Sequence, residues 1–206
     1  HFGAIGYPSS NPLNLGFKVN IAGHAAGAPE SYLGRENFGN GKEGKEVWAV
    51  PGLEKYHGQD LFLTEALTQE VLTALDKPIL EKQPFFIYFA LYGIHTPLMA
   101  NDRLVEPYRE MGMEEPEARY ASMIESMDEA LGNVLNYLEE NDIEDNTVIL
   151  FMSDNGGLSA VARGGKKHTH NHPLKSGKGS IYEGGIRVPM LAYWPGKTQE
   201  ETVNST

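Results

Sequence analysis

Apolar residues return every three or four positions in two long stretches of this chain. The first stretch is 60–76 and the second is 117–140. Such spacing places the apolar side chains on one face of a helix, so we predict an amphipathic helix over each stretch. The first helix should begin near Thr64, and the apolar stripe of the second should face a core.

Three shorter runs are continuously apolar and rich in aromatic or β-branched residues. They occupy 84–91, 147–153 and 188–194, and Pro195-Gly196 ends the last one. Runs of this length and composition are typical of buried strands. Because strands alternate with helices, the pattern predicts an α/β fold in which helices pack on the sheet.

The first 58 residues have little periodicity. They are rich in glycine, asparagine, proline and serine, which favours turns and loops. More than fifty residues of loop are unusual in a compact domain, so we expect this segment to line a site or to pack on neighbours that are missing from this chain.

The net charge of -11 bears on which partners the protein can bind. An acidic protein is repelled by a phosphate backbone, which argues against nucleic acid. The chain has no cysteine, which excludes disulfides and thiolate metal sites. No run of 18 apolar residues indicates a membrane span.

Candidate chemistry is concentrated after the second predicted strand. Asp154 and Asn155 follow the run 147–153 directly. Carboxylate and amide oxygens are ligands that Ca²⁺ and Mg²⁺ accept, and sites of α/β folds assemble at strand ends. The alternative is an Asx turn, since Asn155-Gly156 is a common turn signal.

Two further candidates carry positive charge or a transferable proton. His95 follows the first predicted strand and could protonate a leaving oxygen; the alternative is an ordinary loop histidine. Lys178 lies between two glycines, which let a backbone approach an oxyanion closely; the alternative is an exposed loop lysine.

Three histidines alternate at His168, His170 and His172. On an extended segment they would share one side, which permits a transition-metal site, a basic lip for an anionic substrate, or a plain solvated loop. Glu183 and Arg187 are spaced as a structural ion pair that braces a turn.

Five blocks in this order and spacing resemble the sulfatases, within the alkaline-phosphatase-like superfamily. The blocks span most of residues 84–196: Phe85–Ala90 with His95-Thr96-Pro97, Tyr120–Ala130, Phe151–Gly157, Leu174–Pro189 and Tyr193–Gly196. The resemblance implies a mixed, largely parallel sheet flanked by helices, incomplete in this chain.

The resemblance also implies a role for each matching residue. Asp154 and Asn155 match two of four ligands for calcium or magnesium. Lys178 matches a lysine that contacts the sulfate, and His95 a histidine near the leaving group. His1 matches a histidine that assists the nucleophile and its regeneration.

The family's nucleophile is a formylglycine made from the first residue of a Cys/Ser-x-Pro-x-Arg motif, and this sequence contains no such motif. Residues 1–206 are therefore interpreted as a partial catalytic domain, without the nucleophile segment and the C-terminal subdomain. We predict that this portion alone is inactive and tends to associate.

The leading hypothesis is a sulfuric ester hydrolase that acts on a sulfated small molecule or glycan, with His170 and His172 contacting the substrate. Alternatives are a phosphodiesterase or phosphonate monoester hydrolase of the same superfamily, a non-catalytic module that binds anionic glycans, and a purely structural calcium site at Asp154. Family members are mostly exported or lysosomal.

Overall fold

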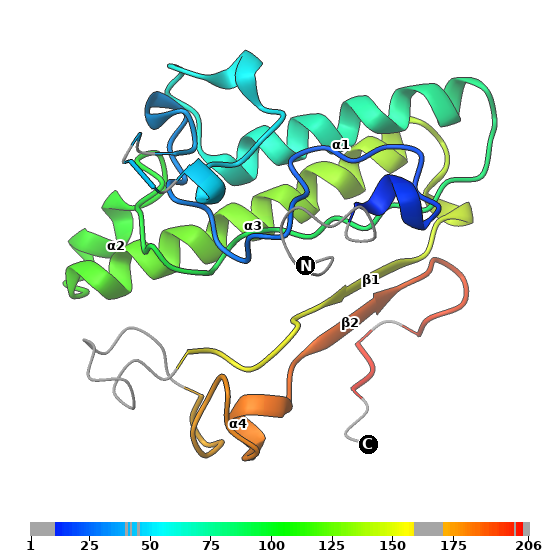
Figure 1. Ribbon diagram of the computed structural model, residues 1–206. Coiled ribbons are helices and arrows are strands. Elements are labelled where there is room, and N and C mark those ends of the chain that lie inside the picture. Colours follow the sequence, from blue (N-terminus) through cyan, green and yellow to red (C-terminus); the bar gives the residue numbers. More distant parts are fainter. Residues whose placement is uncertain are drawn as a thin grey trace. The chain divides into compact units, whose positions relative to one another are not determined.

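The chain divides into two compact units, His1–Val134 and Leu135–Thr206. The computed structural model describes residues 11–39, 41, 43–44, 46–158, 171–199 and 201–203. Figure 1 shows the helices of the first unit and the strands of the second. The candidates His1, His168 and His170 lie outside the described residues.

Helix α1 spans Leu63–Leu80 and confirms the prediction over 60–76. Its first turn is closed by Glu65, whose Oε2 accepts the Phe62 backbone N–H at 2.8 Å. The helix continues four residues beyond the predicted end and includes Pro78. A proline leaves one helical hydrogen bond unmade, which the last turn tolerates.

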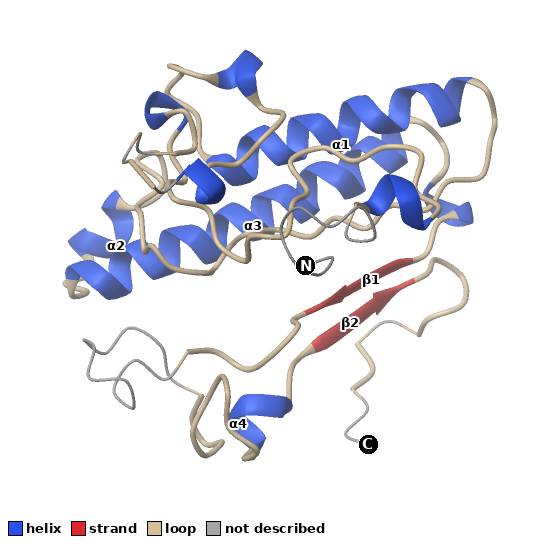
Figure 2. Cartoon of the chain, in the orientation of Figure 1, coloured by secondary structure: helices blue, strands red, loops and turns tan. Residues whose placement is uncertain are grey.

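Helix α3 spans Glu115–Glu140 and confirms the second predicted helix. Met123 and Leu138 of the predicted core-facing stripe are almost fully buried, whereas Ile124 of the same stripe is 43 % exposed, so the stripe is confirmed in part. A short helix, α2, precedes it at Glu106–Glu110. Helices α1 and α3 run side by side (Figures 1 and 2).

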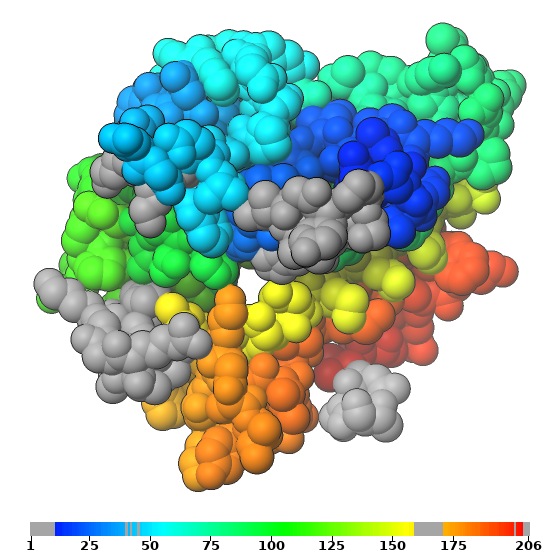
Figure 3. Space-filling model, viewed as in Figure 1, coloured from blue at the N-terminus to red at the C-terminus, as the bar shows by residue number. Residues whose placement is uncertain are grey.

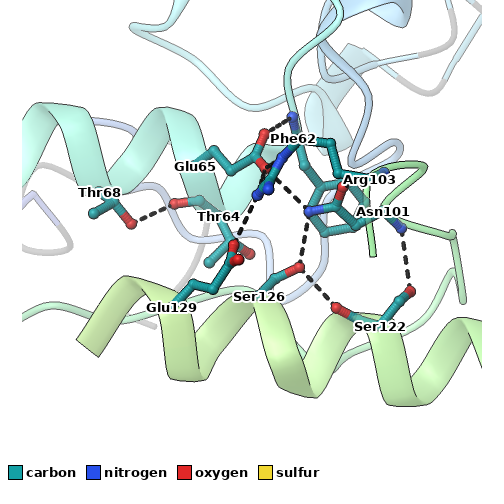
Figure 4. A network of polar contacts seen from close by, with 9 residues as sticks. All are labelled: Phe62, Thr64, Glu65, Thr68, Asn101, Arg103, Ser122, Ser126 and Glu129. Atoms are coloured by element: carbon teal, nitrogen blue, oxygen red, sulfur yellow. Dashed lines mark hydrogen bonds and ion pairs between the residues drawn. The ribbon is translucent and has the colours of Figure 1, made fainter. Parts of the chain in front are cut away.

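A network of polar side chains ties α1 to α3 (Figure 4). Asn101, which is 2 % exposed, donates from Nδ2 to Glu65 Oε1 at 3.2 Å and to Ser126 Oγ at 3.0 Å. Arg103 pairs with Glu65 and reaches Glu129 Oε2 at 2.7 Å. Because most of these groups are satisfied by one another, the loop around residue 101 is fixed between the two helices.

The predicted irregular segment is irregular and yet supplies much of the core. Its short 3-10 turns are Pro12–Leu15, Gly34–Glu36, Glu46–Trp48 and Glu54–Tyr56. Tyr32, Phe38 and Leu53 are fully buried and pack in one cluster with Leu63 and Met123. The residues near 50, in cyan, gather against those near 35, in blue (Figure 3). The described part of this segment thus packs against α1 and α3 of the same chain, and not only on the missing neighbours that were expected.

The second unit contains the sheet. Strands β1 (Ile149–Met152) and β2 (Met190–Tyr193) pair antiparallel, with Ile149 opposite Tyr193. The remaining elements are η6 (Glu144–Asn146) and α4 (Glu183–Ile186). Both strands were predicted from their apolar runs, but the prediction that they are buried is wrong. Leu150 and Leu191 are 58 % and 60 % exposed, because no described element of this unit covers them.

The predicted strand at 84–91 is wrong. These residues have no regular secondary structure, and Phe86 and Tyr88 are 78 % and 60 % exposed. A strand needs a neighbour to complete its hydrogen-bond ladder, and none pairs with this run among the described residues. The described sheet is accordingly one antiparallel pair, without the parallel strands expected. None of the described helices is long and apolar enough to cross a membrane.

Candidate active site

Strand β1 delivers Asp154 and Asn155 just beyond its end, as predicted. Asp154 is exposed and Asn155 is half-buried. The Ser153 hydroxyl donates to the Asn155 carbonyl at 2.8 Å, and Asn155 Nδ2 donates to the Gly156 carbonyl at 3.0 Å. The amide nitrogen of Asn155 is thereby used locally, so its Oδ1 is left as an acceptor that can face a ligand.

The backbone after Asn155 is hydrogen-bonded to the loop that carries Lys178. Gly156 N donates to Gly185 O at 2.9 Å, and Lys178 N donates to Gly157 O at 2.9 Å. Lys178 itself is half-buried. The predicted metal-ligand pair and the predicted anion-binding lysine therefore lie on adjoining segments of one unit.

Glycines make this close approach possible. A Cβ on Gly156 would lie 1.8 Å from the Gly184 carbonyl oxygen. A Cβ on Gly184 would lie 2.3 Å from Ser176 O, and one on Gly185 would lie 2.3 Å from Ser180 O. Real side chains essentially never come this near, so the sequence positions of these glycines follow from the packing of backbone on backbone.

Asn171 is a residue that the sequence reasoning missed. Its Nδ2 donates to Gly157 O and to Ser176 O, both at 3.0 Å, and so bridges the two segments a second time. The signal that could have found it is an amide side chain close before a glycine-rich loop, where Asn commonly binds backbone. The sequence reasoning also missed a contact within the Lys178 loop. Lys175 Nζ lies 3.8 Å from the centre of the Tyr182 ring, which is a cation–π contact.

The side-chain oxygens of Asp154 and Asn155 are of the type that binds a hard cation, but two residues are too few to complete its coordination. One carboxylate and one amide oxygen are ligands that calcium and magnesium prefer. The described residues contain no group of three or more His, Cys, Asp or Glu side chains that could hold a metal ion. A cation at Asp154 would need further ligands beyond this pair, since calcium takes about six to eight oxygens.

His95 belongs to the first unit and lies in a turn rather than at a strand end. Its backbone N–H donates to Tyr92 O at 3.0 Å, which closes the turn. The ring Nδ1 lies 2.9 Å from Thr96 O, so a proton on Nδ1 satisfies that carbonyl and Nε2 is the nitrogen left for other chemistry. The ring is half-buried.

The remaining candidates are placed as follows. His172 is exposed, as a substrate-facing or solvated residue would be. Arg187 Nη1 lies 3.6 Å from Glu183 Oε2, so the predicted structural pair is present.

Comparison with known proteins identifies the family. The family described as Sulfatase matches residues 14–206, which is most of the chain. The chain belongs to the sulfatase family, as the five sequence blocks predict.

Named relatives agree with this membership. The chain is 32% identical over 176 residues to a sulfatase of Formosa agariphila, covering 80% of this chain and 30% of that protein. It is 35% identical over 136 residues to human N-acetylgalactosamine-6-sulfatase, covering 65% and 24% respectively. The chain thus spans about a quarter to a third of the length of these relatives.

Solved structures show the fold. Ps i-CgsB in complex with k-i-k-neocarrahexaose superposes with a TM-score of 0.69 at 30% identity, covering 92% of this chain and 42% of that chain. PsFucS1 sulfatase from Pseudoalteromonas sp. gives 0.52 at 28% identity, covering 65% and 25%. The predicted alkaline-phosphatase-like α/β class is confirmed, and the described residues form a part of it.

Proposed function

We propose that the full-length protein hydrolyses sulfate esters at a divalent metal ion. The observation that carries this proposal is the pair of backbone hydrogen bonds joining Gly156 to Gly185 and Gly157 to Lys178, each 2.9 Å long. They hold an oxygen-donor pair and an ammonium-bearing loop together in one unit. Membership of the sulfatase family supports the same chemistry.

Each candidate then has a distinct task. Asp154 and Asn155 provide two oxygens to Ca²⁺ or Mg²⁺, which would supply positive charge for a tetrahedral anion. Lys178 binds oxygens of the ester group, and its glycine neighbours allow that approach. His95 gives a proton to the leaving oxygen, and His1 assists the nucleophile.

The nucleophile is a formylglycine supplied by a segment outside these 206 residues. Its chemistry is to attack the sulfur of the ester. With the nucleophile and two metal ligands lacking, we expect the 206-residue chain to turn over no ester. Activity should therefore be measured on the gene product at its full natural length.

The proposed substrate is a sulfated glycan. One relative is named N-acetylgalactosamine-6-sulfatase, and one similar structure is a complex with k-i-k-neocarrahexaose. His172 is exposed near the end of the segment before the Lys178 loop, where a basic ring could contact an anionic sugar. We assign the same task to His170.

The first experiment compares an aryl sulfate with an aryl phosphodiester as substrates of the full-length protein. A higher kcat/KM for the sulfate is expected. A phosphodiesterase of the same superfamily uses a similar metal and cationic cradle, so a higher kcat/KM for the phosphodiester would replace this proposal with that alternative.

The second experiment tests the metal site through Asp154→Ala. We expect kcat/KM to fall at least about a hundredfold, together with loss of the thermal stabilisation that calcium gives the wild type. Asp128→Ala, at an exposed position of α3, is the matched control. A lower melting temperature with near-normal activity would instead identify Asp154 as part of a structural calcium site.

A further inference from the structure

Tyr32 is a buried tyrosine whose hydroxyl points at the turn that carries His95. The residue is 0% exposed, and its ring stacks on Phe62 with ring centroids 5.3 Å apart. Its hydroxyl oxygen lies 2.7 Å from Tyr92 O and 2.8 Å from His95 O. A buried hydroxyl needs a partner, and this one shares its proton between the two carbonyls that begin and end the turn.

Tyr92, the residue that begins this turn, is itself held by its side chain. Its own hydroxyl lies 2.8 Å from Ala22 O and 2.8 Å from His24 Nδ1. Burial lowers the pKa of His24, so the imidazole is neutral at neutral pH and Nδ1 can pair with a hydroxyl. Two tyrosine hydroxyls thus link the turn to residues 22–32 of the irregular segment.

The anchored carbonyl belongs to the residue that carries the imidazole. His95 O is the backbone atom that Tyr32 binds, and His95 N donates to Tyr92 O at 3.0 Å. Both ends of the His95 main-chain unit are therefore fixed, and its Nδ1 is fixed by Thr96 O at 2.9 Å. What remains for a substrate is Nε2, whose direction depends on these bonds.

We propose that Tyr32 is a positioning residue for His95, a role that rests on the proposed function of His95 as the proton donor. In the protonated imidazole, Nδ1–H binds Thr96 O and Nε2–H faces the ester. The proton passes to the ester oxygen as its bond to sulfur breaks, the electron pair of that bond stays on the oxygen, and the sulfuryl group would pass to the nucleophile of the proposed function. Without the Tyr32 hydroxyl the turn loses one of its two hydroxyl anchors, the one on the His95 carbonyl, and Nε2 shifts away from the ester oxygen.

The test uses Tyr32→Phe in the full-length protein with two substrates, 4-nitrophenyl sulfate and phenyl sulfate. The nitrophenolate leaves readily without a proton, whereas the departure of the more basic phenolate depends more strongly on a proton donor. We expect kcat for phenyl sulfate to fall about tenfold, kcat for 4-nitrophenyl sulfate to change less than about twofold, and KM to stay the same. His95→Gln should show the same preference more strongly.

Tyr56→Phe is the matched control. Tyr56 is also buried, and its hydroxyl donates to Glu70 Oε1 at 2.7 Å, away from the turn. It should lose stability as Tyr32→Phe does and keep wild-type kcat on both substrates. An equal loss on both substrates in Tyr32→Phe, while His95→Gln discriminates between them, would overturn the positioning role.

A separate measurement tests the positioning role of Tyr32 even if the proposed function is wrong. If the wild type hydrolyses neither sulfate, the His95 imidazole signals of labelled protein are compared by NMR. Tyr32→Phe should shift them and Tyr56→Phe should leave them in place, because of these two tyrosines it is Tyr32 whose hydroxyl binds the His95 carbonyl, while that of Tyr56 binds Glu70. Unshifted signals in Tyr32→Phe would reject the inference independently of activity.

Discussion

The two units hold their candidate residues by different means. In the first unit, the His95 turn is anchored by the hydroxyl of Tyr32, a fully buried side chain of the core. In the second unit, Asp154 and Lys178 are brought together mainly by backbone-to-backbone bonds between segments rich in glycine. One candidate residue, His95, is thus held by side-chain packing, whereas Asp154 and Lys178 are held where glycines leave side chains out.

The two units also differ in how much of their apolar surface is buried. The first unit has a contiguous core built from the irregular segment, α1 and α3. The strands of the second unit expose Leu150, Met152 and Met190 by more than half. Apolar area left in water contributes nothing to the stability of the fold. The second unit therefore depends more than the first on contacts from outside the unit that would bury these side chains.

The largest expected effect of this contrast is association of the 206-residue chain. Leu150 and Met152 are two positions apart on β1 and share a face with Met190, which pairs with Met152. We expect oligomers or aggregates in size-exclusion chromatography at high concentration. The double substitution Leu150→Lys, Met152→Lys should raise the monomer fraction, and a sharp monomer peak for the unchanged chain would contradict the prediction.

Gly156→Ala tests the glycine contacts of the second unit directly. The new Cβ would lie 1.8 Å from Gly184 O, a backbone atom that cannot rotate away. We expect the segments of Asp154 and Lys178 to separate, with a cost of at least about 3 kcal/mol in the free energy of unfolding. Thermal unfolding and the kcat/KM of the full-length protein would both report the loss.

Gly132→Ala is the control for this change. Gly132 lies within α3, and a Cβ there would meet no atom within 4 Å. Alanine favours a helix over glycine, so this variant should gain up to about 1 kcal/mol. Similar destabilisation of both variants would mean that backbone entropy, and not the close contact, explains the glycine at 156.

Local patterns predicted the local elements of both units. The helical spacing of apolar residues over 60–76 and 117–140 was enough to predict α1 and α3. The continuous apolar runs were enough to predict β1 and β2. The run 84–91 has the composition of a strand, but a strand exists only with a partner, and composition carries no information about partners.

Long-range bonds explain what the sequence could not reveal about the site. Tyr32 binds carbonyls 60 and 63 residues further along, and backbone carbonyls have no identity in a sequence. The adjacency of Asp154 and Lys178 was expected from the resemblance to sulfatases, and their glycine neighbours were the only local clue. Asn171 was missed because its partners are likewise backbone oxygens.

Asn101→Ala sharpens the comparison from the first unit. Asn101 is 2 % exposed and joins Glu65 of α1 to Ser126 of α3. Its removal takes one hydrogen-bond donor from Glu65 and Ser126 and the acceptor from the Arg103 backbone N–H, so we expect a loss of about 2 kcal/mol in chemical denaturation. Asn133→Ala, at an exposed position of α3, should change stability by less than about 0.5 kcal/mol. Equal losses would show that the network is not what joins the helices.

His24 gives the first unit a predicted pH dependence. Burial lowers its pKa below the ordinary 6.5, and the unfolded chain has the ordinary value. Between the two values the unfolded state binds more protons, so the stability from neutral His24 is present above about pH 6.5 and is lost as pH falls through the folded pKa. Melting temperatures from about pH 7.5 to about pH 5 would show the decline.

His24→Gln should flatten this decline, and His57→Gln, at an exposed position in the same unit, should leave it unchanged. The Gln side chain cannot take up a proton in this range, so only the replaced titration is removed. If both variants decline as the wild type does, other groups cause the acid sensitivity.

Glu183→Gln should have the smallest effect and marks the limit of the contrast. Glu183 and Arg187 are each 59% exposed and their charged atoms are 3.6 Å apart. Water and salt screen such a pair, so the free energy of unfolding should change by less than about 0.5 kcal/mol. Unlike Gly156, this position contributes a side chain and not a close backbone contact. A loss comparable to that of Gly156→Ala would show that the second unit also depends on specific side chains, and the distinction between the two units would then no longer hold.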